Sequence, residues 1–226
     1  MRTENLDIFV ATNEHIVTNV KLTQILVDNR NYDYGAYSSI LNNNKKIIRD
    51  YDYLFFINST VRGPFIDINF DKSWVEHIIS FFDDETGIVG SSINILSKQS
   101  NYDEIFRKEY NFDQQLSHVQ TPFYILPSHI VQKLVRDGFY NNSKTLNKTQ
   151  TIIHYEILLS VMIIKYGFNL RTFNYQYNQI DYRKSHDDIN FSSYNGSSLR
   201  KNGFFGRTYL PQELIFFKTN RGMISF

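Results

Sequence analysis

Residues 51–65, YDYLFFINSTVRGPF, decide how the rest of the chain is organised. Residues 53–57 form an unbroken apolar run, which predicts a strand buried on both faces of a mostly parallel sheet. Beyond the carboxyl end of such a strand, open α/β sheets bind their ligands. The other interpretation is an ordinary polar strand end, closed by the turn at Gly63-Pro64. The polar residues directly after the run are Asn58, Ser59, Thr60 and Arg62.

The composition of the 226-residue chain is that of a folded protein with a substantial core. Aromatic residues make up 16% of the chain, whereas Gly and Pro number only 10 and 4, so disordered and fibrous classes are disfavoured. The formal net charge of +1 provides no long-range field toward nucleic acid or an anionic membrane. Cysteine is absent, which excludes disulfides, Cys-ligated zinc and thiol catalysis.

The start of the sequence, MRTENLDIFV, lacks the basic region and long apolar core of a signal peptide. No apolar run has the length of a membrane span. These features predict a soluble, cytoplasmic protein with no transmembrane segment and no nucleic-acid partner. Length and composition favour a single domain, in which residues 1–180 form the main part and the polar loop and C-terminal segment of residues 181–226 complete it.

Strand and helix patterns alternate along the chain, which predicts an α/β fold with a mostly parallel central sheet flanked by helices. Residues 98–115 suit a surface helix or a variable loop, and residues 141–151 suit an exposed loop. Gly138 and Gly167 are typical of helix ends. Strands are expected at residues 7–12, 24–27, 53–57, 87–95, 118–127 and 169–177, and helices at residues 35–42, 72–82, 128–137 and 152–166.

Two of these helices carry candidate functional residues. The loop of residues 28–37, DNRNYDYGAY, leads into a helix whose first N–H groups suit a phosphate or diphosphate. Its alternative interpretation is a plain helix cap made by Asp33. The helix of residues 152–166 is apolar nearly all round, yet it contains Glu156. A carboxylate there costs several kcal/mol unless it faces a cleft, is hydrated or is paired, and a buried salt bridge is the alternative.

Four motifs in chain order connect these segments to a known family. The sequence resembles glycosyltransferases of the GT-A type and is similar, more narrowly, to the rhamnan-synthesis F group and related polysaccharide glycosyltransferases. The resemblance spans residues 7–168, and a motif at residues 211–218 looks like one that closes such enzymes. The four motifs are Asn31-x-Asp33-x-Gly35-Ala36-Tyr37, Asn58-Ser59 with Gly63-Pro64, His118-x-Gln120-x-x-Phe123, and Tyr155-Glu156 with Gly167-Phe168. The closing motif is Pro211-x-Glu213-x-x-Phe216-x-Lys218.

The resemblance implies a GT-A (Rossmann-like) fold that transfers a hexose or deoxyhexose from a nucleotide-sugar donor to a glycan acceptor, with inversion. The nucleoside diphosphate that leaves gains negative charge, so it needs a metal, cationic side chains or N–H donors. The donor-binding residues implied in this way are Asn31, Asp33, Gly35, Asn58, Ser59, Thr60, Arg62, Lys218 and Arg221.

The acceptor hydroxyl also needs a base. Glu156 matches the helical Tyr-Glu position of the family and is the candidate for this catalytic role. His118 is the competing base or a hydrogen-bond donor to the sugar, and its alternative role is structural.

The chain departs from the family pattern in two ways. The metal-binding Asp-x-Asp of typical GT-A enzymes is absent; neutral oxygens at residues 58–60 are poor ligands for Mg²⁺ or Mn²⁺, so no metal ligand is assigned and metal dependence stays open. A strand and helix usually precede the strand matched to residues 7–12. These departures keep open a second function, a non-catalytic glycan- or nucleotide-sugar-binding relative. A nucleotide hydrolase is a third, although the P-loop pattern G-x-x-x-x-G-K-[ST] is absent.

Overall fold

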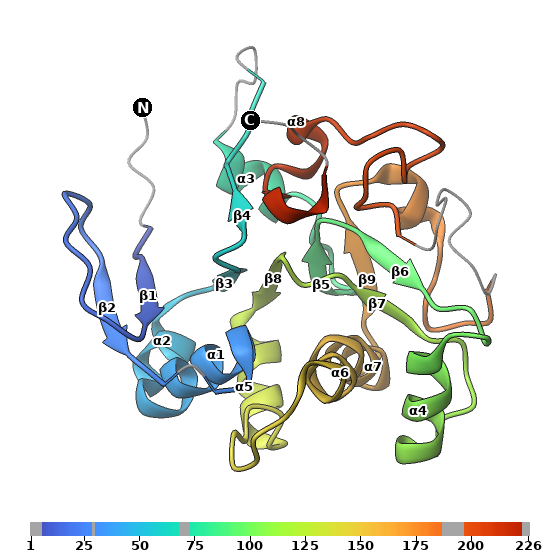
Figure 1. The fold of residues 1–226 in the computed structure, drawn as a ribbon, viewed down its shortest axis with the longest axis horizontal. Coiled ribbons are helices and arrows are strands. Elements are labelled where there is room, and N and C mark those ends of the chain that lie inside the picture. The colour runs from blue at the N-terminus through green and yellow to red at the C-terminus, as the bar shows by residue number, and fades with distance from the viewer. Residues whose placement is uncertain (1–5, 29, 68–72, 187–196, 223–226) are drawn as a thin grey trace.

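The computed structural model describes residues 6–28, 30–67, 73–186 and 197–222, which form a mixed α/β fold (Figure 1). A four-stranded sheet lies at its centre, in the spatial order β3 (Tyr53–Ile57), β8 (Phe123–Pro127), β5 (Thr86–Gly90) and β9 (Asn169–Thr172). Two-stranded sheets within the same residues pair β1 (Phe9–Thr12) with β2 (Thr23–Leu26), β4 (Val61–Arg62) with β10 (Phe217–Lys218), and β6 (Ile93–Ile95) with β7 (Ser117–Val119).

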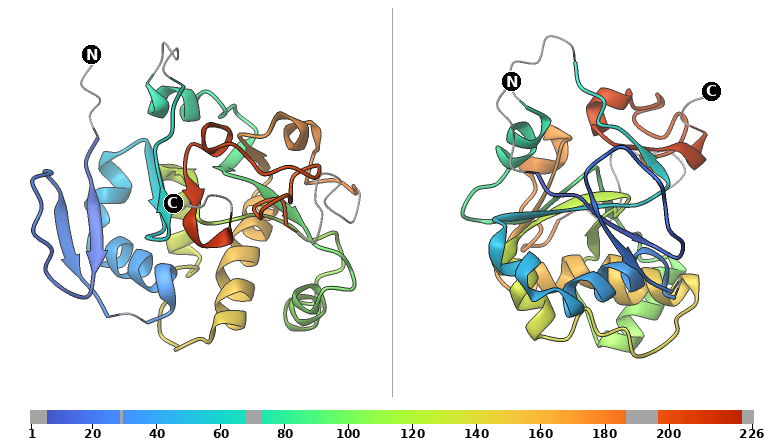
Figure 2. Two further views of the ribbon diagram at one scale, coloured as in Figure 1. Left: turned by 45° about the horizontal axis from the view of Figure 1, so that its top comes forward. Right: turned by 90° about the vertical axis from the view of Figure 1, so that its left-hand side faces the viewer.

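Helices cover the central sheet on both faces (Figures 1 and 2). A π-helical turn, Ile152–Ile157, continues directly from α6 (Lys148–Thr151) into α7 (Leu158–Lys165). The layer drawn below the sheet contains α1 (Tyr32–Asn43), α2 (Lys45–Asp50), α4 (Asn101–Tyr110), α5 (Ser128–Arg136), α6 (Lys148–Thr151) and α7 (Leu158–Lys165). The opposite side carries α3 (Trp74–Ile79) and α8 (Pro211–Leu214), and short 3₁₀ turns occur at Tyr175–Gln179 and Thr219–Arg221.

Strand direction differs from the sequence expectation of a mostly parallel sheet. β8 runs antiparallel to both β3 and β5, and only β5 and β9 are parallel within the central sheet. β3 is an edge strand among the described residues, and it is not buried on both faces as expected: Leu54 and Phe56 are buried, but Ile57 is 43% exposed. The prediction of a mostly parallel sheet failed because an apolar run carries no information about the direction of the neighbouring strand.

Three predicted strands also have different bounds. The run at residues 87–95 forms two strands, β5 and β6, and the run at residues 118–127 likewise forms β7 and β8. The break between β5 and β6 is held by Ser92, whose Oγ donates to Gln120 Oε1 at 2.7 Å. The strand predicted for residues 169–177 ends at Thr172, whose N–H and C=O both bind the Asn178 side chain. Local polar side chains therefore ended strands that hydrophobicity alone would have continued.

The helix predictions were closer to the structure. Gly138 and Gly167 follow α5 and α7 with positive φ angles of 81° and 93°, as expected for helix ends. The helix predicted from residue 35 instead begins at Tyr32, so Asp33 lies in its first turn and is not its cap. Part of the helix predicted at residues 72–82 lies outside the described residues, and the remainder contains α3.

Stacked aromatic side chains join neighbouring elements in the main core. The rings of Phe56 and Tyr124 stack with centroids 4.7 Å apart, which joins β3 to β8. Tyr34 and Tyr155 stack at 4.8 Å and join α1 to the π-helical turn. Stacked pairs add about 0.5–1.5 kcal/mol beyond their burial. The Tyr34–Tyr155 pair therefore helps to fix the position of α1 relative to the π-helical turn.

A packing prediction follows from Gly87 in β5. A Cβ atom at this position would lie 2.5 Å from Cγ2 of Ile163 and 2.7 Å from Cβ of Phe168. We expect Gly87→Ala to lower the free energy of unfolding by about 1–3 kcal/mol, measured by urea titration. Adding Ile163→Leu removes the β-branch methyl and should recover part of this loss. Strictly additive effects of the two substitutions would contradict this packing.

Candidate functional site

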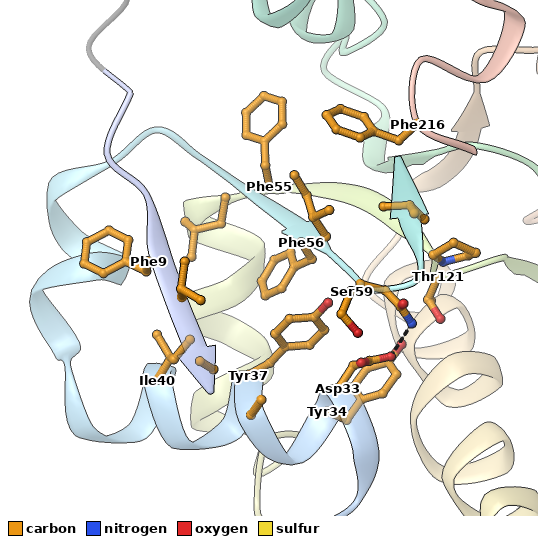
Figure 3. A pocket seen from close by; sticks show the side chains of 18 of the residues that line it. Phe9, Asp33, Tyr34, Tyr37, Ile40, Phe55, Phe56, Ser59, Thr121 and Phe216 are labelled. Atoms are coloured by element: carbon orange, nitrogen blue, oxygen red, sulfur yellow. Dashed lines mark hydrogen bonds between the residues drawn. The ribbon is translucent and has the colours of Figure 1, made fainter. Parts of the chain in front are cut away.

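A cavity of about 1870 Å³ is lined by β1, α1, β3 and the segments that follow β3. Figure 3 shows apolar side chains on one side of it, including Phe9, Ile40 and Phe56, and polar side chains beyond the end of β3. We call this second part the polar end of the cavity; its residues are Asp33, Asn58, Ser59, Thr60, Gln120, Thr121, Lys148, Glu156, Lys218 and Arg221.

The loop after β3 is locked to the first turn of α1. Asn58 Nδ2 donates to Asp33 Oδ2 at 2.5 Å, the contact drawn as a dashed line in Figure 3. Asn58 Oδ1 in turn accepts hydrogen bonds of 2.6 Å from both the backbone N–H and the hydroxyl of Thr60. Burial raises the pKa of Asp33 above its usual value, although the Lys218 charge and the Asn58 hydrogen bond oppose the shift. These bonds hold Asp33 and Asn58 in a defined geometry at the cavity.

Glu156 enters the polar end from the π-helical turn, with 24% of its side chain exposed. Thr121 Oγ1 donates to its Oε2 at 3.3 Å, and His118 Nε2 lies 3.5 Å from its Oε1. Burial raises the pKa of Glu156, but His118, the Lys218 charge and the Thr121 hydrogen bond outweigh it, so the net shift is downward. The carboxylate is therefore ionised at neutral pH, as a base must be. π-Helical turns are rare and are often found at functional sites.

Lys218 is delivered to the polar end by the C-terminal strand. β10 pairs antiparallel with β4, opposite Val61, and Thr219 donates from its N–H and its hydroxyl to the Thr60 carbonyl, both at 3.0 Å. Burial lowers the pKa of Lys218, and the charge of Arg221 lowers it further, whereas the charges of Glu156 and Asp33 act in the opposite direction. Lys218 thus interacts electrostatically with both carboxylates of the polar end.

A third cation, Lys148, was missed from the sequence. It lies in the stretch expected to be an exposed loop, but it begins α6 and lines the cavity with Lys218 and Arg221. Asn147 and Gln150 form a reciprocal capping box there, with bonds of 2.9 and 3.0 Å. This Asn-x-x-Gln spacing was the signal that would have identified the helix start.

Four of the residues predicted from the sequence do not line the cavity. Arg62 is exposed and its Nη1 donates to the adjacent Val61 carbonyl. Gly35 has a packing role, since a Cβ atom there would lie 1.7 Å from the Arg30 carbonyl oxygen. Neither residue lines the cavity, so the contact with a donor expected for both stays a prediction. The other two are His118 and Asn31.

His118 lies behind Glu156 rather than on the cavity surface. Its side chain is only 4% exposed, and within the described residues its buried Nδ1 has no hydrogen-bond partner. With Nε2 directed at Glu156, the imidazole can hold the carboxylate in place as a positioning residue. This geometry favours the structural alternative for His118 over a role as base or as donor to the sugar.

Asn31 is used entirely inside the protein. Its Nδ2 donates to the Lys144 carbonyl at 2.6 Å and also to Asn142 Oδ1. Its Oδ1 accepts from the Leu146 N–H at 2.7 Å. It therefore ties the start of α1 to the segment before α6, with 3% of its surface exposed. We expect Asn31→Ala to cost about 1–3 kcal/mol of unfolding free energy in urea titration. A loss of ligand affinity in Asn31→Ala without a loss of stability would contradict this structural role.

The charged side chains of the polar end suit a bound anion better than a bound divalent cation. Its carboxylates among the described residues are Asp33 and Glu156, and the charge of Lys218 acts on both. No group of three or more His, Cys, Asp or Glu side chains in the described ranges is arranged to hold a metal. The positively charged side chains here match a phosphate or diphosphate.

Comparison with known proteins adds no relative: no family model, no curated protein and no solved structure matches the chain. Of the helices in the part that the structure describes, none is both long and apolar enough to cross a membrane.

Proposed function

We propose that this protein is a glycosyltransferase that moves a hexose or deoxyhexose from a nucleotide-sugar donor to a hydroxyl of a glycan acceptor, with inversion at the anomeric carbon. One observation carries the proposal: the Glu156 carboxyl group lines the same cavity end as three cationic side chains, Lys148, Lys218 and Arg221. Displacement of a nucleoside diphosphate needs this combination of a base and positive charge.

The reaction follows from the two kinds of group. Glu156 takes the proton of the acceptor hydroxyl as its oxygen attacks the anomeric carbon, and the bond from that carbon to the diphosphate oxygen breaks. The electron pair of that bond leaves with the nucleoside diphosphate, whose added charge the cations stabilise. His118 and Thr121 orient the Glu156 carboxylate.

A second candidate function is the non-catalytic binding of a nucleotide-sugar or glycan. The observation that favours it is the neutral end of β3, where Asn58 and Thr60 satisfy each other by hydrogen bonds. Such a protein would hold the same donor with the same cations and would lack turnover.

The experiment that tests the proposal is a ligand-observed NMR screen of the purified protein against UDP-, GDP- and dTDP-sugars, each with and without Mn²⁺. We expect one donor to bind and to be hydrolysed slowly over hours, because water can replace the absent acceptor. Binding without hydrolysis or transfer to any acceptor would favour the binding protein. No binding to any donor, by a protein shown to be folded, would reject the proposal.

A further inference from the structure

Two unpaired strand edges border the same cavity. Among the described residues β1 is hydrogen-bonded only to β2, and β3 only to β8, so each has a free edge. Residues of both strands line the cavity, and Figure 3 shows β1 and β3 with the cavity side chains between them. We call the space between these two edges the slot. Free edges are a template for strand addition, and natural proteins normally cover or charge them.

The backbone groups that face the slot follow from the hydrogen bonds on the opposite edges. β2 donates to the carbonyls of Ile8 and Thr12, so the alternate residues Phe9 and Ala11 direct their N–H and C=O groups to the slot. On β3, the Asp52 carbonyl accepts from Ser128 and the Asn58 N–H donates to Pro122, both towards β8. The residues of β3 that face the slot are therefore Tyr53, Phe55 and Ile57.

Both faces of the slot are apolar. On the helix side the cavity is lined by Tyr37, Ile40 and Ile47, and on the opposite side by Trp74 and Ile79. A strand inserted here would be covered on both faces, and strands of that kind are continuous runs of Val, Ile and Leu.

Charge distinguishes the two ends of the slot. β1 and β3 begin side by side, since the Tyr51 hydroxyl donates to Asp7 Oδ2 at 2.6 Å and the rings of Phe9 and Tyr51 lie 6.0 Å apart. Asp7, Asp50 and Asp52 line the cavity near this end. Within the described residues Asp50 has an ion-pair partner, Arg49, whereas no such pair is found for Asp7 or Asp52. The acidic end complements a basic residue at the start of an inserted strand.

The two-stranded unit of β1 and β2 also exposes apolar side chains. An isolated two-stranded sheet is at best marginally stable in water. The β1–β2 unit and its connection nevertheless expose large apolar side chains, and this concentration of apolar surface is typical of an interaction site. The exposed apolar residues are Leu6, Ile8, Ile16, Val17, Val20 and Leu26.

From these observations we propose that the slot binds an extended segment of a different protein, not of a second copy of this chain, and that this segment joins β1 and β3 into one sheet by strand addition. The segment consists of one or two Lys or Arg residues followed by about five apolar, β-branched residues, the usual length of a strand. This inference does not depend on the proposed transferase function.

The test uses the purified protein and a fluorescein-labelled peptide of two lysines, a run of valine and isoleucine, and a Gly-Ser tail. We expect the fluorescence anisotropy to rise on binding and amide hydrogen exchange to slow at Phe9, Ala11, Tyr53, Phe55 and Ile57. Peptides N-methylated at alternate residues, in two versions that each block one edge, should both bind about tenfold more weakly than the parent peptide. A peptide with glutamate in place of lysine should also bind more weakly.

A matched pair of variants tests the protein side. Ala11→Pro removes one N–H group from the slot without removing a bond to β2, and should weaken peptide binding about tenfold, whereas Ala11→Ser retains the N–H and should bind normally. Thermal unfolding checks that both variants fold, and the N-methylated peptides test the native protein if Ala11→Pro does not. The proposal would be overturned if the N-methylated peptides bound as tightly as the parent peptide, or if exchange at the five amides did not change when the peptide was added. A stable dimer that excludes the peptide would overturn it too, because a second copy would then occupy the slot.

Discussion

Replacing Glu156 by Gln is expected to lower the rate of sugar transfer by about 10²–10⁴-fold while donor affinity stays within about twofold, because general-base catalysis contributes that factor. The substitution keeps the size of the side chain and its hydrogen bond from Thr121, but it removes the charge that the surroundings stabilise. Single-turnover transfer with the donor found in the NMR screen measures the rate, and titration of the same donor measures the affinity.

The matched control is Glu104→Gln, an exposed glutamate in the first turn of α4. It changes the net charge equally and should leave transfer unchanged. If Glu156→Gln transfers sugar at the normal rate, Glu156 is not the base; if it loses donor affinity and transfer in the same proportion, the carboxylate binds the donor and does not take the proton.

The second large effect is expected for Lys218→Met. The variant keeps an unbranched apolar stem but lacks the ammonium group, so a nucleoside diphosphate should bind about 10- to 100-fold more weakly, the value of a charge-assisted hydrogen bond. The corresponding nucleoside, which has no phosphate, should bind as before. Isothermal titration with both ligands measures the difference. Exposed Lys201→Met is the matched control.

The same variant should change the pH dependence of transfer. The charge of Lys218 lowers the pKa of Asp33 and of Glu156, so its removal raises both. Because Glu156 must be ionised to act, transfer is lost as the pH falls through its pKa, and the acid limb of the rate profile should move to higher pH. An unchanged acid limb together with unchanged diphosphate affinity would show that Lys218 takes no part in the site.

Sequence patterns were most successful where local chemistry decides the outcome. The bounds predicted for β3 agree with the structure, and the helix ends at Gly138 and Gly167 are confirmed by their positive φ angles. Glu156 was conspicuous as a carboxylate in an apolar helix, and in the structure His118, Thr121 and the charge of Lys218 stabilise it. Such features depend on a few neighbouring residues, which a linear pattern contains.

The amino-acid sequence by itself determined the alternating α/β elements, the polar turn after β3 and the presence of an ionisable group in the helix of residues 152–166. Only the tertiary structure decided that β8 runs antiparallel to its neighbours, that Lys148 and Lys218 join Glu156, and that Asn31 and Arg62 do not. The reason is physical. Capping depends on neighbours along the chain, whereas strand direction and the meeting of charges depend on how distant segments pack. The hydrogen bond from Thr219 to Thr60, separated by 159 residues, illustrates this.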